Sequence, residues 1–269
     1  MTNADPLTVW DEAAQDLLAL LHDLSEEEWD RPALPGWTVR DVLAHLTHLE
    51  SEAAGFEQPA GGRVVVEPAR NQPMPTEVTE AGVAARRGRS AQELLTELER
   101  ASAVRREALA SADLSDPKAP ALGLAGELGW DMRTWLRNRP IDLWVHEQDI
   151  RRATGRPMTT ATTGAAHVAG VMTAAFPAAL RKLSAGTSVV AHVSGPQGRV
   201  LTARVGEDGR AAPFAPEDGA EAEAVVLEMS DETWLLLTGG RIAPEDAEVT
   251  VTGDADIAAR VLRQLNVTP

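Results

Sequence analysis

Residues Leu34–Glu50 read LPGWTVRDVLAHLTHLE, and this stretch determines how the first part of the chain folds. Pro35 and Gly36 stop the preceding element, and Thr38 with Asp41 three residues later is typical of a helix N-terminus. Apolar side chains then recur at helical spacing, at Val39, Val42, Leu43, Leu46 and Leu49. The stretch therefore predicts a turn followed by an amphipathic helix.

Four further segments have the apolar spacing of helices and cover residues 5–24, 90–112, 132–154 and 160–182. Pro140 lies inside the third and predicts either a kink or the true start of that helix. Residues 58–75 and 115–130 are predicted to be loops. Four or five helices with short and medium connections suit an up-down bundle.

The pattern changes after residue 185. Residues 188–195, 199–207, 222–230 and 247–254 alternate at period two or are rich in β-branched residues, which predicts strands. Short helices are predicted at 230–237 and 254–265. This order indicates a small α+β domain with helices packed on one sheet. We therefore predict an α+β chain of two domains, 1–158 and 159–269, with helix 160–182 packing with either.

The composition excludes several classes of function. The 269 residues include 25 basic and 41 acidic side chains, and a formal charge of −16 argues against nucleic-acid or anionic-membrane partners. The sequence has no cysteine, which excludes disulfides, thiolate metal sites and a cysteine nucleophile, and no tyrosine, which excludes a phenolic acid. Any reactive thiol must therefore come from a cofactor or a substrate.

Neither a targeting segment nor a membrane span is expected. The N-terminal residues lack a basic region, an apolar core and a cleavage site of a signal peptide. The longest apolar stretch, Ala165–Leu180, is shorter than the roughly 20 residues that a membrane span needs. We expect a cytoplasmic protein.

Three residues on two predicted helices form a candidate metal site. His45 belongs to the inward row of the helix predicted within Leu34–Glu50. Asp142 and His146 are four residues apart and share one face of helix 132–154. Two imidazoles and a carboxylate are typical of catalytic zinc or another divalent ion. The alternative is a surface Asp–His pair and a hydrogen-bonded core histidine.

Residues near this candidate site have two interpretations each. Asp149 either orients the imidazole of His146 or pairs with an arginine on the helix surface. Trp37 is predicted to pack on the first helical turn as a hydrophobic staple. His48 is predicted to support the site or to lie on the surface, with a role as substitute ligand as the alternative.

Arginines are concentrated in the sequence around Asp142 and His146. Six lie between residues 133 and 156: Arg133, Arg137, Arg139, Arg151, Arg152 and Arg156. They either complement the helix C-terminus and form surface ion pairs or provide an anion site, since guanidinium groups bind carboxylates through two hydrogen bonds. Arg241 follows two glycines in LTGGRIAPE and is either a turn residue or a site residue.

The Leu34–Glu50 stretch, together with RPIDLWVHEQDIRRATGRP at Arg139–Pro157, resembles the mycothiol-dependent maleylpyruvate isomerase family of actinobacteria. The run from Met229 to Pro269 resembles the second domain of that family. The resemblance implies a DinB-like metal-binding helix bundle followed by a small α/β domain with sterol-carrier-protein-like character. The three blocks occur in the expected order and cover nearly the whole chain.

The resemblance also implies roles for individual residues. The first metal ligand of the family falls on His45, and its Glu-x-x-x-His pair falls on Asp142 and His146, so an aspartate replaces the glutamate. An arginine of the second domain is implied in the active cleft, for which Arg241 is the catalytic candidate. Arg151 and Arg152 are the candidates for binding the cofactor.

The implied activity requires two cofactors, a divalent metal, for which zinc is the first candidate, and mycothiol. In the isomerase interpretation a thiol adds to a cis-enedioic acid, the single bond rotates, and elimination restores the alkene. One alternative is a mycothiol S-transferase acting on another small electrophile. The other is a non-enzymatic binding module with a degenerate metal site. The oligomeric state is left open.

Overall fold

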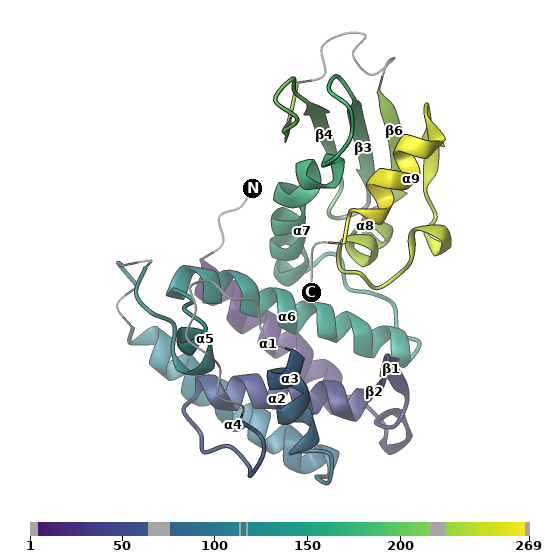
Figure 1. Ribbon diagram of the computed structural model, residues 1–269. Coiled ribbons are helices and arrows are strands. Elements are labelled where there is room, and N and C mark those ends of the chain that lie inside the picture. The colour runs from purple at the N-terminus through teal and green to yellow at the C-terminus, as the bar shows by residue number, and fades with distance from the viewer. Residues whose placement is uncertain (1–4, 64–75, 113, 117, 216–223, 267–269) are drawn as a thin grey trace. The chain divides into compact units, whose positions relative to one another are not determined.

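The computed structural model describes residues 5–63, 76–112, 114–116, 118–215 and 224–266, and it divides into two compact units, 1–158 and 159–269 (Figure 1). The first unit is helical apart from one short hairpin, and the second combines a sheet with helices. The predicted α+β fold class with two domains is confirmed.

Four long helices build the first unit: α1 (Pro6–His22), α2 (Val39–Ala53), α4 (Ala91–Ala110) and α6 (Met132–Ala153). Helix α2 packs against α4 and α6, and α1 packs against α6 and α4 (Figure 1). Their apolar faces form one buried core that includes Trp10, Leu17, Leu43, Leu94 and Leu143. Each of the four corresponds to a helix that the apolar spacing predicts.

Three details differ from the sequence prediction. Helix α6 runs through Pro140 as one element, so the proline does not mark its start. A five-residue helix, α5 (Gly123–Glu127), interrupts the predicted loop 115–130, and α3 (Thr76–Ala84) was not predicted. Of the predicted loop 58–75, residues 64–75 lie outside the described residues. A short 3-10 helix, η1 (Glu26–Glu28), precedes the hairpin.

The quoted stretch forms a tight hairpin that leads directly into α2. Strands β1 (Pro32–Leu34) and β2 (Trp37–Thr38) pair antiparallel around Pro35 and Gly36, and Gly36 has the positive φ of 78° that glycine tolerates. The Oγ1 of Thr38 accepts from the backbone N–H of Asp41 (3.2 Å), and Oδ2 of Asp41 accepts from the N–H of Thr38 (3.0 Å). This reciprocal cap fixes where α2 begins.

Small and polar residues also mediate the contacts of α2 with α4 and with α3. The hydroxyl of Ser51 donates to Oε1 of Glu97 on α4 at 2.7 Å. On the side of α3, Gly82 lies so close to the ring of His48 that a Cβ at this position would be 2.2 Å from Cδ2 of the imidazole. Helix α3 can therefore seat on α2 only with a glycine at this point.

The second unit contains a five-stranded mixed sheet in the order β5-β4-β3-β6-β7. Strand β3 pairs parallel with β6, and the other neighbours pair antiparallel. The elements in chain order are α7 (Thr163–Ala175), η2 (Phe176–Leu180), β3 (Ser188–Ser194), β4 (Arg199–Val205), β5 (Ala211–Ala212), β6 (Val225–Ser230), α8 (Asp231–Thr238), η4 (Pro244–Asp246), β7 (Thr250–Thr252) and α9 (Ala255–Arg263).

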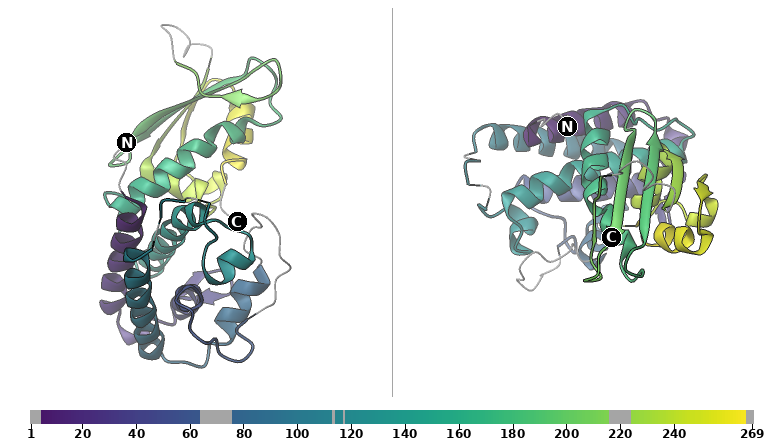
Figure 2. Two further views of the ribbon diagram at one scale, coloured as in Figure 1. Left: turned by 90° about the vertical axis from the view of Figure 1, so that its left-hand side faces the viewer. Right: turned by 90° about the horizontal axis from the view of Figure 1, so that it is seen from above.

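The helices of the second unit cover one face of this sheet (Figure 2). Burial alternates along β4 and β6, so that Leu201, Ala203, Leu227 and Met229 are buried while their neighbours are more exposed. Helix α7 contacts η2 and α8, and the ring of Phe176 stacks edge-on against Trp234 at 5.8 Å.

The segment Thr163–Leu180 is long and apolar enough, by length and composition alone, to cross a membrane, with a mean hydropathy of 1.2 over its 18 residues. Among the described residues it is the one segment that meets these criteria. Val168, Met172 and Phe176 in it are buried within the protein. Buried core helices meet the same criteria, and our expectation that the chain has no membrane span stays a prediction.

We predict that Gly82→Ala lowers the free energy of unfolding of the first unit by about 1–3 kcal/mol, because the added methyl group overpacks the contact with His48. Urea denaturation followed by tryptophan fluorescence measures this, since six of the seven tryptophans lie in residues 1–158. Gly88→Ala is the matched control, because no atom lies within 4 Å of a Cβ there. Equal stability of the two variants would contradict the prediction.

Candidate metal centre

His45 projects from α2 toward α6 and is almost completely buried. Its Nε2 lies 3.4 Å from Oδ1 of Asp142, which is on α6. The other ring nitrogen, Nδ1, is buried without a hydrogen-bond partner. The nitrogen that faces Asp142 is therefore the one that His45 offers to a ligand.

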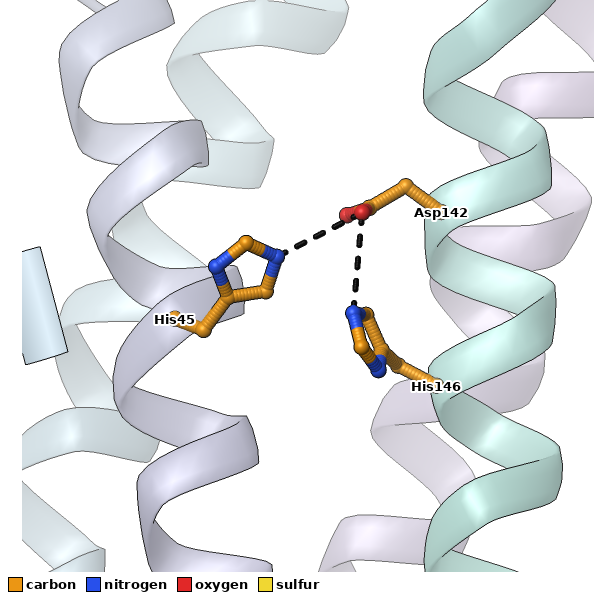
Figure 3. Close-up of side chains that lie close together, drawn as sticks. All are labelled: His45, Asp142 and His146. Carbon is orange, nitrogen blue, oxygen red and sulfur yellow. Dashed lines mark hydrogen bonds and ion pairs between the residues drawn. The ribbon is translucent and has the colours of Figure 1, made fainter. Parts of the chain in front are cut away.

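Asp142 and His146 lie one turn apart on α6 and both point toward His45 (Figure 3). Nε2 of His146 is 3.6 Å from the same Oδ1 of Asp142. The three ligand atoms all lie within 4.8 Å of one another, and among the described residues this is the one such group of three or more histidine or acidic side chains. The structure thus brings together the three residues that the sequence singles out.

Two of the three separations between these atoms fit a small divalent cation. Ligand atoms at about 2.0–2.1 Å from a tetrahedral zinc ion are roughly 3.3 Å apart. The observed separations of 3.4 and 3.6 Å between Oδ1 and the two Nε2 atoms are close to this value. Two imidazoles and one carboxylate also leave a position open for another ligand.

The electrostatic environment favours the protonation states that metal binding requires. Burial lowers the pKa of His45 below its usual range, although Asp142 acts in the opposite sense, so this imidazole is kept neutral. Burial by itself would raise the pKa of Asp142, but the neighbouring Arg139 guanidinium is the main cause that outweighs it and holds that pKa far below its usual range. The site therefore presents a neutral imidazole at His45 and an anionic carboxylate at Asp142, as metal binding requires.

Asp149 orients the second histidine. Its buried Oδ2 lies 3.0 Å from Nδ1 of His146, one turn along α6. A carboxylate at this distance accepts the Nδ1 proton, which fixes the orientation of the ring and directs Nε2 of His146 toward Asp142. Of the two interpretations of Asp149, the structure supports the one in which it orients this imidazole.

Trp37 lies against both imidazoles. Its ring centre is 5.3 Å from that of His45 and 6.5 Å from that of His146, and the two imidazoles meet edge-on at 4.9 Å. The indole Nε1 donates to Oε1 of Glu80 on α3 at 3.0 Å. The sequence predicted Trp37 only as a hydrophobic staple on the first turn of the helix. Its contact with the two imidazoles was not predicted, because sequence spacing does not show what lies across a helix interface.

Arg139 and Glu50 form a buried ion pair behind the site. The guanidinium donates to Oε1 of Glu50 from Nη2 (2.7 Å) and Nε (3.1 Å), and to Oδ2 of Asp142 from Nη1 (2.6 Å). Arg139 was predicted only as one of six arginines near the site, and Glu50 was not predicted. The spacing of three residues between Arg139 and Asp142 was the available signal.

His48 belongs to a different polar cluster. Its Nδ1 lies 3.2 Å from Oε1 of Gln58, and the fully buried Arg86 donates from Nη2 to the same oxygen at 2.8 Å. Arg86 also pairs with Glu97 at 2.8 Å. Burial lowers the pKa of His48 to about 4. His48 is therefore a packing residue on the α3 side of α2 and is not part of the group of ligand atoms.

The other predicted site residues have contacts on their own elements. Nε of Arg151 donates to Oε1 of Glu147 at 2.7 Å, and Arg152 is exposed near the end of α6. Nη1 of Arg241, in the second unit, donates to the carbonyl of Gly239 at 2.7 Å. Their roles in binding a cofactor or substrate stay predictions.

Comparisons with known proteins agree with the fold and with the first unit in particular. A family model for the mycothiol maleylpyruvate isomerase N-terminal domain matches residues 10–151, which include all three candidate ligands. A crystal structure of the mycothiol-dependent maleylpyruvate isomerase is similar to this chain, with 17% identity and a TM-score of 0.55. A structure of a histidine-to-alanine mutant of that protein gives 16% identity and a TM-score of 0.54.

Each of these likenesses covers 92% of this chain and 91% of the other, so the shared fold extends over both units. No curated protein matches the sequence.

We predict that Asp149→Asn weakens zinc binding by about 10- to 100-fold. The neutral amide attracts the Nδ1 proton of His146 less strongly than the carboxylate does, and its NH2 group can instead donate to Nδ1, which would move the ring proton to Nε2. Competition with a chromophoric chelator measures the affinity. Asp30→Asn changes an exposed carboxylate that pairs with Arg40 and serves as the control. Unchanged affinity in Asp149→Asn would show that Asp149 has no part in orienting the histidine.

A second prediction concerns pH. The pKa of His48 is about 4 in the folded protein and 6.5 in the unfolded chain. Between pH 4 and 6.5 the unfolded chain therefore binds a proton at His48 that the folded protein does not bind. The first unit should therefore lose stability as pH falls from 7 to 4, by about 3 kcal/mol more than a His48→Gln variant does. Urea denaturation at a series of pH values tests this, and parallel profiles for the two proteins would refute it.

Proposed function

Since the chain belongs to the mycothiol maleylpyruvate isomerase N-terminal domain family, we propose that it catalyses a metal- and mycothiol-dependent cis–trans isomerisation of the maleylpyruvate type. The substrate class is a small cis-enedioic acid. The proposed metal ligands are Nε2 of His45, Oδ1 of Asp142 and Nε2 of His146.

One observation carries the proposal: two imidazoles and a carboxylate converge in a buried site of a chain that has no cysteine. Isomerisation about a C=C bond requires that the double bond be lost temporarily, and addition of a thiolate achieves this. A chain without a thiol must obtain one from outside. The family supplies the chemical class of that thiol.

The divalent metal and mycothiol would contribute the reactive chemistry. When bound, a divalent metal would lower the pKa of a coordinated thiol and polarise a carbonyl oxygen of the substrate. Mycothiol, when bound, would supply a thiolate as the nucleophile for reversible addition to the alkene, and it would be regenerated at the end of the reaction.

The residues of this chain prepare the site for that chemistry. Burial keeps the imidazole of His45 neutral, and Asp149 accepts the Nδ1 proton of His146, so both imidazoles are suited to act as ligands through Nε2 and not as general bases. The indole of Trp37 lies against the two rings and restricts the access of water on that side.

Positive side chains remain candidates for binding the carboxylates of the substrate and of the cofactor. We propose Arg241 for the substrate and Arg151 and Arg152 for mycothiol, since guanidinium groups bind carboxylates through paired hydrogen bonds. Each is tested by its own substitution to glutamine, with KM and kcat measured separately for substrate and for mycothiol.

We predict that the protein purified without chelators contains a divalent metal and converts maleylpyruvate to fumarylpyruvate only when mycothiol is present. His45→Ala should lose at least about tenfold in metal affinity and all detectable conversion, because it removes one of three ligands. Elemental analysis and an absorbance assay measure these properties. His22→Ala changes an exposed histidine and should behave as the wild type.

The outcomes separate the alternatives. Absence of metal from the wild type would reject both enzyme proposals and favour a binding module. Bound metal and a thermal shift with mycothiol, but no isomerisation, would reject the isomerase and favour a mycothiol S-transferase that acts on another electrophile.

A further inference from the structure

The two carboxylate oxygens of Asp142 face different partners. Oδ1 is the atom near both imidazoles, at 3.4 Å from His45 and 3.6 Å from His146 (Figure 3). Oδ2 accepts a hydrogen bond of 2.6 Å from Nη1 of Arg139. One oxygen is therefore directed at the candidate metal position and the other is already in use.

Arg139 itself has little freedom to move. Its side chain is 7% exposed, and its Nε and Nη2 both donate to Oε1 of Glu50, which is 1% exposed. Releasing Oδ2 would leave one N–H of a buried guanidinium without an acceptor, which is costly.

A fourth charged group stabilises Glu50 in turn. The guanidinium of Arg105 is buried and lies 3.9 Å from the ring centre of Trp135. Burial lowers the pKa of Arg105 to about 10, while Glu50 acts to raise it. Asp142, Arg139, Glu50 and Arg105 thus alternate in sign from the site into the interior.

We propose that Arg139 is a positioning residue that holds Oδ2 of Asp142, so that this aspartate offers a bound metal one oxygen only. The inference rests on the metal site of the proposed function. An aspartate without such a partner can bind a metal through both oxygens after a small rotation of its carboxylate group.

The arrangement has two chemical consequences. A one-oxygen aspartate keeps the coordination number contributed by the protein at three and leaves positions open for thiol and substrate. Arg139 also draws negative charge away from Oδ1, which makes a bound cation a stronger Lewis acid.

Cobalt(II) substitution tests the proposal without reference to activity, because visible absorption by cobalt(II) weakens as its coordination number rises. In Arg139→Gln, Oδ2 becomes free to coordinate, and we expect the visible bands of the cobalt protein to be roughly twofold weaker than those of the wild type. Glu50→Gln keeps an acceptor for Arg139 and should retain the wild-type spectrum.

Arg139→Gln leaves Glu50 buried without its partner, so the double variant Arg139→Gln/Glu50→Gln is measured as well and should show the same weakened spectrum. Arg137→Gln, an exposed arginine of the same helix, controls for loss of a positive charge. Circular dichroism establishes that each variant is folded.

Wild-type bands in both Arg139→Gln variants, or equal weakening in Glu50→Gln, would overturn the positioning role while leaving the proposed function intact. Failure of the wild-type protein to bind cobalt(II) at all would overturn both.

Discussion

Buried charge between α2 and α6 is the constraint on which the arrangement of the site depends. Arg139 and Glu50 are almost completely buried in this interface, where an unpaired charge costs several kcal/mol. The helices therefore bring Asp142, Arg139 and Glu50 together in alternating sign, with hydrogen bonds of 2.6 to 3.1 Å. The same pairing leaves one oxygen of Asp142 facing two imidazoles.

Helix α2 serves two clusters at once. His45 faces α6 and the candidate metal position, whereas His48, one turn later, packs under α3 against Gly82 and Gln58. Helix α3 is in turn connected to the site, because Glu80 accepts from the indole of Trp37, whose ring lies against His45. The hairpin and cap at the start of α2 fix the register of all these contacts, since a displaced helix start would rotate every side chain on it.

The long helices could be predicted because their apolar residues recur over many turns, as they do in α1, α2, α4 and α6. The nine-residue α3 and five-residue α5 have too few turns for a periodic signal. Pro140 suggested a kink or a later start of the helix, but α6 runs through it as one element, with Leu136 and Leu143 packed in the core. In the site, the spacing of Asp142, His146 and Asp149 on one helix was readable. Glu50 and Trp37 were not predicted to lie behind and beside the ligands, because their partners are on other elements.

The sequence by itself determined that any reactive thiol must be external, since it contains no cysteine, and it placed His45 in the inward row of one helix and Asp142 and His146 on a shared face of another. It also determined where α2 begins, because the cap is a local interaction between Thr38 and Asp41. Only the tertiary structure decided which atoms meet: that Oδ1 of Asp142 faces both histidines while Oδ2 is held by Arg139, and that His48 is excluded. The physical reason is that helical periodicity fixes a face, whereas desolvation of charges across an interface selects the partner of each atom on it.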